Sequence, residues 1–204
     1  MALLSLLTYL SFILASSPAF REYQLQALLK LFRRDPLKAQ AAALYNALLD
    51  RAREPALYGE NGAPDTVDGR FDIIVLHAAL VMRRLREQGE EGRRLAQALF
   101  GRMFDDLDAA LREMGIGDLS VGKKIKVMAE AFYGRAAAYD TALKAGDSAA
   151  LKEALWRNLF DSAPERESAA SGLAAYAMAA DARLAAVSLS AFQSASLPVL
   201  HNTD

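Results

Sequence analysis

The sequence predicts an all-α protein, and composition and periodicity are the observations that predict it. Of the 204 residues, 41 are Ala and 32 are Leu, whereas Val, Ile and Thr together number 16. Ala and Leu favour helices, and β-branched residues favour strands. Apolar residues recur at helical spacing, and no segment of strand length alternates between apolar and polar residues. We therefore expect a single compact helical domain of about six main helices, with a variable Ala-rich helix at its C-terminal end.

Residues 1–28 form an apolar N-terminal extension. Met1 to Phe20 carry no charge, and the run lacks the basic residue that precedes the apolar core of a secretory signal. Its length is at the short edge of what a membrane-spanning helix needs. Because Arg21, Lys30 and Arg33 follow, an inserted helix would leave the rest of the chain in the cytoplasm. Three interpretations stay open: a weak membrane anchor, residues from an over-extended start site, and a signal peptide.

The first helix of the body is expected to begin at Asp35-Pro36, because Asp is a favoured N-cap and Pro suits the first helical position. This helix ends by Glu54-Pro55. A segment dense in Gly, Pro, Asn and Asp follows, up to Gly69. A loop of this length is often functional in a compact domain. A plain surface excursion is the other interpretation.

The second helix, Arg70 to Gln88, is expected to be the central one, since its apolar residues lie nearly all round its circumference. A turn over Gly89 to Gly92 follows. Further helices are predicted over Arg93 to Met114 and over Ser120 to Lys144, each with apolar residues at helical spacing on one face. The intervening glycines end the first of these two helices.

The C-terminal part is predicted to contain two more helices. Asp147 caps the first, and Pro164 opens the second, which is rich in Ala. From Ser188 onward the helical pattern decays into a polar tail. We accordingly divide the chain into the extension 1–28, a helical domain over 29–164, and an Ala-rich helix with a polar tail over 165–204. We expect residues 29–164 to fold without the extension.

Composition excludes several kinds of chemistry. The chain has no Cys, two His and a net charge of −1. The absence of Cys removes disulfides, thiol catalysis and thiolate metal sites, and the near-neutral charge argues against nucleic-acid binding. Residues 117–124 nearly match a phosphate-binding P-loop, but they lack the Ser or Thr after the Lys and the preceding strand. We expect no enzymatic activity, no catalytic residue, no metal, no cofactor and no small-molecule ligand.

Four residues are predicted to have structural roles. His77 lies midway along the central helix and is expected to be a core histidine with a hydrogen-bond partner. Asp105 and Asp108 share one side of their helix and are expected to belong to a solvated acidic face, not a metal cluster. Arg135 is expected to pair with a carboxylate of the helix over 105–113.

Lys123, Lys124 and Lys126 are candidates for partner binding. They lie in the first turns of a helix, where the helix dipole favours acidic residues. The unfavourable electrostatic contribution is only tenths of a kcal/mol per residue, so tolerated, solvated lysines remain one interpretation. A docking patch for an acidic protein surface or for anionic lipid headgroups is the other.

Two stretches carry a resemblance to a known family: FDIIVLHAALVMRRLR at 71–86 and MFDDLDAALREMGIGDLSVGKKIKVMAEAFYGRAAAYDTAL at 103–143. The sequence resembles the ubiquinol–cytochrome c chaperone family from about Leu31 to about Asp161, as a bacterial member. Residues 1–28 and the Ala-rich end beyond Pro164 fall outside this resemblance. The residues that carry it most specifically are Asp105, Asp108, Leu111, Arg112, Glu113, Gly115, Gly117, Asp118, Val121, Phe132, Tyr133, Gly134, Arg135 and Tyr139.

The resemblance implies an all-helical, non-enzymatic protein that supports assembly of respiratory complex III. Mitochondrial members of the family are assembly factors for cytochrome b. The implied partner is newly made cytochrome b or another membrane-protein client. The implied place is the cytoplasm, peripheral to the inner face of the inner membrane. Two alternatives stay open: a helical scaffold or adaptor unrelated to respiration, and an enzyme of unknown type.

Overall fold

The structure is a computed structural model that describes residues 35–200 of the chain. The chain divides into two units, Met1–Pro36 and Leu37–Asp204, and the following account concerns the second. The expected N-terminal extension, residues 1–28, lies outside the described residues. Helices joined by short connections make up the described part, and its one β-bridge, Tyr58 with Ala63, is isolated. The predicted all-α fold class is confirmed.

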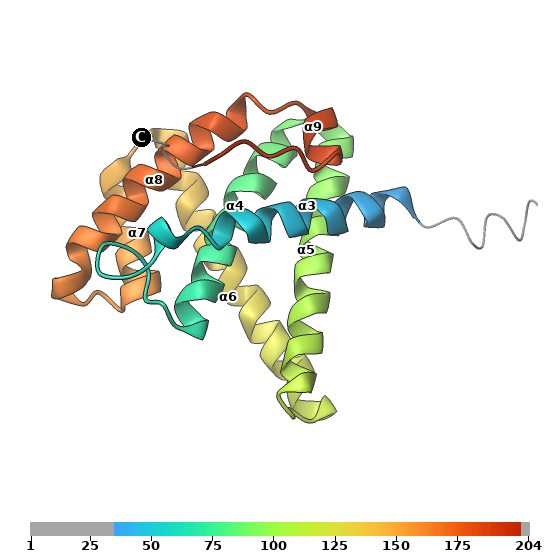
Figure 1. Cartoon of the computed structure of the whole chain (residues 1–204), viewed down its shortest axis with the longest axis horizontal. Coiled ribbons are helices and arrows are strands. Elements are labelled where there is room, and N and C mark those ends of the chain that lie inside the picture. Colours follow the sequence, from blue (N-terminus) through green and yellow to red (C-terminus); the bar gives the residue numbers. More distant parts are fainter. Residues whose placement is uncertain (1–34, 201–204) are drawn as a thin grey trace, which may run out of the picture. The chain divides into compact units, whose positions relative to one another are not determined.

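The helices follow the predicted order, with small shifts of their ends. Their bounds are α3 Pro36–Ala52, η1 Pro55–Leu57, α4 Val67–Glu87, α5 Gly89–Glu113, α6 Asp118–Ala145, α7 Ser148–Phe160, η2 Pro164–Arg166, α8 Glu167–Ala185 and α9 Leu189–Gln193 (Figure 1). The two elements labelled η are 3₁₀ turns.

The connection between α4 and α5 is shorter than the predicted turn over Gly89–Gly92. Gln88 alone separates the two helices, and Gly89 reverses the chain with a φ of 77°. L side chains rarely adopt this angle, so glycine is favoured there. Gly92 lets the start of α5 approach the end of α4 closely, because a Cβ at this position would lie 2.1 Å from the Leu85 carbonyl oxygen.

Helix α4 is the buried helix of this unit, as its all-round apolar pattern predicts. It contacts α5, α6 and α8. Its N-terminus is capped by Thr66, whose hydroxyl accepts a hydrogen bond from the Gly69 amide at 3.2 Å. From Ile73 to Leu85 most apolar side chains of the helix are fully covered, among them Leu76, Leu80 and Met82. The core of the domain is therefore built around α4.

The Gly-rich segment before α4 packs against the body of the protein. Leu57 and Ala63 are buried, and the Ala63 amide donates a hydrogen bond to the Leu57 carbonyl at 2.8 Å. Arg166 of η2 donates to the carbonyl of Gly59 at 3.0 Å and to that of Gly62 at 2.5 Å. These contacts favour the structural interpretation of this loop over a functional one.

Helix α8 contributes directly to the core, which changes the expected division at residues 164 and 165. It contacts α4 and α7, and it buries Leu173, Ala177 and Leu184. Pro164 begins the 3₁₀ turn η2, and α8 itself begins at Glu167. Because α8 covers one side of α4, residues 29–164 alone would leave part of that helix uncovered.

The expected polar tail after Ser188 is also partly wrong. Ser188 caps a short helix, α9, and the chain beyond it buries apolar side chains against the same core. Phe192 is 0% exposed, Leu197 8% and Leu200 1%. Arg51 of α3 donates a hydrogen bond to the Leu197 carbonyl at 3.0 Å. Spaced single apolar residues, not a helical stripe, anchor this segment, so periodicity gave no sign of it.

A buried ionic cluster joins three helices and was not predicted. Arg83 of α4 lies 3.1 Å from Asp181 of α8 and 3.0 Å from Asp140 of α6. Arg84 forms a two-pronged pair with Asp181, at 2.8 and 2.5 Å. Asp181 is the isolated acid in an Ala-rich helix, and that isolation was the available sequence signal. The arginines at the C-terminal end of α4 therefore connect this helix to α6 and α8.

Candidate interaction surface

The predicted partner-binding lysines lie at one end of the α5–α6 hairpin. Gly115, with a φ of 83°, reverses the chain after α5, and α6 begins at Asp118. Within the Leu37–Asp204 unit, these ends of α5 and α6 extend past the neighbouring helices (Figure 1). Arg112 holds the two ends together, since it donates to Asp108 on α5 at 2.5 Å and also to Asp118 on α6.

One face of the first half of α6 is turned away from α5. Val121 is fully buried and Ile125 and Met128 are partly buried, so these positions mark the inward face. Helical spacing places a second set of residues on the opposite face. This set, here called the outer face of α6, comprises Leu119, Lys123, Lys126, Val127 and Glu130.

The outer face of α6 combines exposed apolar and basic side chains. Leu119 is 91% exposed and Val127 64% exposed. Lys123 and Lys126 are exposed beside them, as is Lys124 on the adjoining side of the helix. Exposed apolar side chains that lie together mark interaction sites more often than single ones do. The arrangement suits a partner with both apolar and acidic groups.

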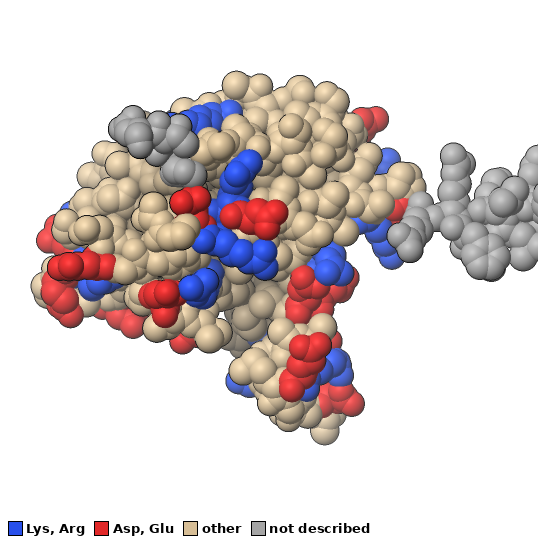
Figure 2. Space-filling model, viewed as in Figure 1, with Lys and Arg blue, Asp and Glu red and all other residues tan. Residues whose placement is uncertain are grey.

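The three lysines differ in their local pairing. Lys126 lies 3.9 Å from Glu130, both well exposed, and such a surface pair contributes about 0–1 kcal/mol. Lys123 and Lys124 have no ion-pair partner among residues 35–200. Their charges are therefore available to a binding partner. Acidic and basic side chains are mixed over the end of this hairpin (Figure 2).

The acidic residues of α5 lie at separate places on the helix. Asp106 pairs with Arg102, and Asp108 pairs with Arg112. Asp105 is exposed and has no ion-pair partner in the part of the chain that the structure describes. Within that part, no three His, Cys, Asp or Glu side chains are grouped so as to hold a metal ion. Contacts thus support a structural role for Asp108, and none supports one for Asp105.

Arg135 pairs with Asp72 of α4, so the predicted partner on the helix over 105–113 is wrong. The side chain of Arg135 is 24% exposed and that of Asp72 12% exposed. Burial raises the pKa of the Asp72 carboxyl, and the Arg135 guanidinium opposes that rise. The packing of α6 against α4 decides this pairing, and the sequence does not show which helix faces Arg135.

His77 is fully buried, and its two ring nitrogens have partners. Nδ1 lies 2.8 Å from the Ile73 carbonyl oxygen, and Nε2 lies 2.6 Å from the Tyr176 hydroxyl. Since a carbonyl only accepts, Nδ1 carries the proton and Nε2 accepts from Tyr176. Burial lowers the pKa of His77 to about 4, so the ring is neutral at pH 7.

The near P-loop, residues 117–124, follows a helix and not a strand.

No helix among residues 35–200 has the length and apolar character needed to cross a bilayer.

Residues 60–199 match the family model described as ubiquinol-cytochrome C chaperone. The chain belongs to the ubiquinol–cytochrome c chaperone family. The resemblance seen in the sequence is confirmed, and the match continues beyond Pro164, through α8 and α9. The Ala-rich end is thus part of the family domain.

Relatives of known name agree with this membership. The crystal structure of a Cbp3 homolog from Brucella abortus is 34% identical, with a TM-score of 0.70 over 83% of this chain and 94% of that one. Ubiquinol-cytochrome-c reductase complex assembly factor 1 of Xenopus laevis is 26% identical over 125 residues, which span 61% of this chain and 62% of the frog protein. The human protein of that name is 25% identical, and the matched region spans 42% of its length.

Proposed function

We propose that this chaperone-family protein is a non-enzymatic assembly factor for ubiquinol–cytochrome c reductase, with newly made cytochrome b or a similar membrane subunit as its client. The family match over residues 60–199 is the observation that carries the proposal. Relatives from frog, mouse and human are named as assembly factors of that complex. We place its action in the cytoplasm, at the inner face of the inner membrane, as a peripheral protein.

The outer face of α6, together with Lys124 on its adjoining side, is proposed as the docking surface for the client or for the anionic lipid beside it. Lys123 and Lys124 are free to bind acidic groups, and Leu119 offers exposed apolar area next to them. Anionic lipid headgroups attract a basic residue at the surface by roughly 1 kcal/mol. With a Debye length of about 8 Å in physiological salt, this attraction acts only at close range.

Deletion of the gene tests the proposed function. We expect membranes of the deletion strain to lose the reduced-minus-oxidised absorption band of haem b, and the band to return when the intact gene is supplied on a plasmid. A scaffold or adaptor unrelated to respiration predicts a normal haem b band and the loss of some other complex. A normal band would therefore rule out the assembly function and leave that alternative.

Charge reversal at the three lysines tests the docking surface. The variant Lys123→Glu, Lys124→Glu, Lys126→Glu is expected to melt like the wild type and to lower the haem b level at least severalfold, because it repels anionic partners. The matched control reverses three exposed cations elsewhere: Lys38→Glu, Arg94→Glu and Arg157→Glu. Both variants change the net charge equally. A normal haem b level in a stable Lys→Glu variant would reject the docking role, and these lysines would then be merely solvated surface residues.

The three introduced glutamates also place negative charge at the N-terminus of α6, where the helix dipole stabilises acidic residues. A second variant with Gln at positions 123, 124 and 126 removes the positive charge without this gain. It is expected to give an intermediate haem b level, since it removes attraction without adding repulsion.

A further inference from the structure

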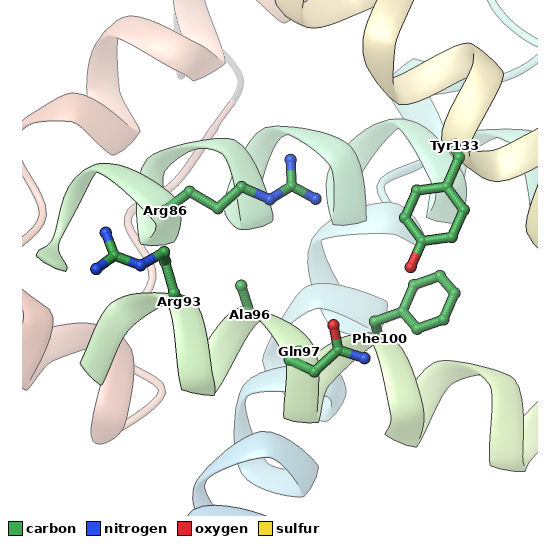
Figure 3. Close-up of a pocket in the computed structure, with 6 residues that line it drawn as sticks. All are labelled: Arg86, Arg93, Ala96, Gln97, Phe100 and Tyr133. Atoms are coloured by element: carbon green, nitrogen blue, oxygen red, sulfur yellow. The ribbon is translucent and has the colours of Figure 1, made fainter. Parts of the chain in front are cut away.

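A groove lies between the end of α4, the start of α5 and the middle of α6, away from the hairpin end described above. Its volume is about 290 Å³, near the lower end of the roughly 300–1,000 Å³ of ligand pockets. Such a groove holds one or two side chains of a bound peptide. The residues that line it are Arg86, Arg93, Ala96, Gln97, Phe100 and Tyr133 (Figure 3).

An exposed aromatic stack forms one end of the groove. The rings of Phe100 and Tyr133 are stacked, with centroids 5.0 Å apart and an angle of 28° between their planes. Phe132 packs behind both of them, at 5.5 and 5.8 Å. Tyr133 is nonetheless 48% exposed. An aromatic side chain fixed by such packing offers a large apolar contact area and loses little rotamer entropy when a partner binds.

Positive charge forms the other end of the groove. Figure 3 shows the Arg86 side chain extending along α4 in the direction of Tyr133. Arg86 has no ion-pair partner among the described residues, whereas its neighbours Arg83 and Arg84 are held by Asp181. Arg93 is paired only with Glu90, at 2.8 Å on the exposed surface of the same helix. A surface pair of this kind is weak and readily exchanged.

We propose that this groove binds an acidic–aromatic segment of a partner protein, with a carboxylate on Arg86 and an apolar side chain on the Phe100–Tyr133 stack. A guanidinium fork binds a carboxylate through two parallel hydrogen bonds, which fixes orientation as well as charge. The Gln97 amide, one turn from Arg93, can bond to the backbone of the same segment. The recessed shape favours a protruding side chain over a flat lipid surface. The inference does not depend on cytochrome b being the client.

The test uses the full chain and two fluorescein-labelled peptides. One peptide contains Glu-Phe-Glu-Leu flanked by Gly and Ser, and the other contains Gln in place of each Glu. We expect anisotropy to show binding of the acidic peptide at least fivefold tighter than that of its Gln counterpart. Arg86→Gln and Tyr133→Ala are each expected to weaken binding of the acidic peptide at least fivefold. Arg94→Gln, an exposed arginine on α5 outside the groove, is the matched control and is expected to bind as the wild type does.

Two further measurements make each outcome decisive. Melting temperatures show whether each variant is folded. If Tyr133→Ala does not fold, Tyr133→Phe takes its place, and this variant is expected to retain binding because it keeps the ring stack. Equal binding of the two peptides, no binding of the acidic peptide, or an unchanged affinity in Arg86→Gln would overturn the proposal. Binding of phosphatidylglycerol vesicles that depends on Arg86, with no peptide binding, would assign the groove to lipid instead.

Discussion

His77 places an acid-sensitive contact in the middle of the core. Its ring is neutral and accepts a hydrogen bond from the Tyr176 hydroxyl, and burial lowers its pKa to about 4. In the unfolded chain the ordinary histidine pKa is about 6.5. Below that pH the unfolded state binds a proton that the folded state does not. The folded state therefore loses stability as the pH falls from about 6.5 towards 4.

We predict that the free energy of unfolding falls by about 2 kcal/mol between pH 7.5 and pH 5 through His77, from the difference of the two pKa values. Urea unfolding at a series of pH values measures this change. His77→Gln is the comparison, since Gln can bond to both partners but does not titrate. Its stability is expected to be lower at pH 7.5 and much flatter with pH. If the variant shows the same slope as the wild type, the acid sensitivity has another source.

The Arg135–Asp72 pair makes a prediction at the same scale. Arg135→Gln is expected to lower the free energy of unfolding by about 2 kcal/mol, less than the 3–5 kcal/mol of a fully buried pair, because both side chains keep some exposure. The loss is expected to shrink as the pH falls below the raised pKa of Asp72, since a protonated carboxyl needs no cation. Thermal melts at several pH values check both points.

A double variant separates the pair from other effects of the substitution. Asp72→Asn with Arg135→Gln removes both charges, and its loss is expected to be smaller than the sum of the two single losses. Additive losses would show that the two side chains do not stabilise each other. Arg94→Gln serves as the control for removing an exposed arginine.

At the scale of the elements, the Asp181 cluster fixes how α8 lies on α4. Asp181→Asn is expected to destabilise the protein by about 3 kcal/mol, because it leaves the Arg83 guanidinium buried with weaker partners. Glu165→Gln removes an exposed acid just before the same helix and is expected to change stability by less than about 0.5 kcal/mol. Denaturant unfolding of both variants checks this, and equal effects would contradict it.

The helices themselves were largely predictable, because their signals are local. The Asp147 cap, the glycine after α6 and the 3.6-residue periodicity all act within a few residues, whereas the Thr66 cap was missed and α4 begins at Val67, not at Arg70. The Ser188–Leu200 segment was not predictable in this way. Its three anchors are separated by small and polar residues, so only the shape of the existing core tells which of them are buried.

The candidate site was predictable in part. The exposure of Lys123 and Lys126 follows from their position opposite the apolar stripe of α6, and Lys124 lies beside that face. Leu119 lies on the same outer face by the same spacing, but our prediction rested only on the charges there and missed this exposed apolar residue. The partner of Arg135 and the groove at Arg86 depend on helix packing, which brings together residues far apart in sequence.

At the scale of the whole molecule, the described helices share one hydrophobic core that includes side chains of α8 and of the segment after it. A chain of residues 35–204 is expected to unfold in a single cooperative transition. A chain of residues 35–164 lacks the cover that α8 gives to α4, and it is expected to show no cooperative melt. Circular dichroism against temperature tests both. A cooperative melt of the shorter chain would support the domain boundary after residue 164 that the sequence predicts.

Arg112 bears on the proposed encounter between this protein and an unfolded client. By bonding to Asp108 and Asp118, it closes the turn between two helices whose backbones are already fixed. Most of the order in this hairpin comes from the two helices themselves, since exposed ion pairs such as those of Arg112 contribute about 0–1 kcal/mol each. Fixing one backbone residue of an unfolded chain costs about 1–2 kcal/mol, and nearly all of that entropy loss falls on the client segment. In the proposed interaction, this entropy loss favours short-lived contacts over tight, long-lived capture.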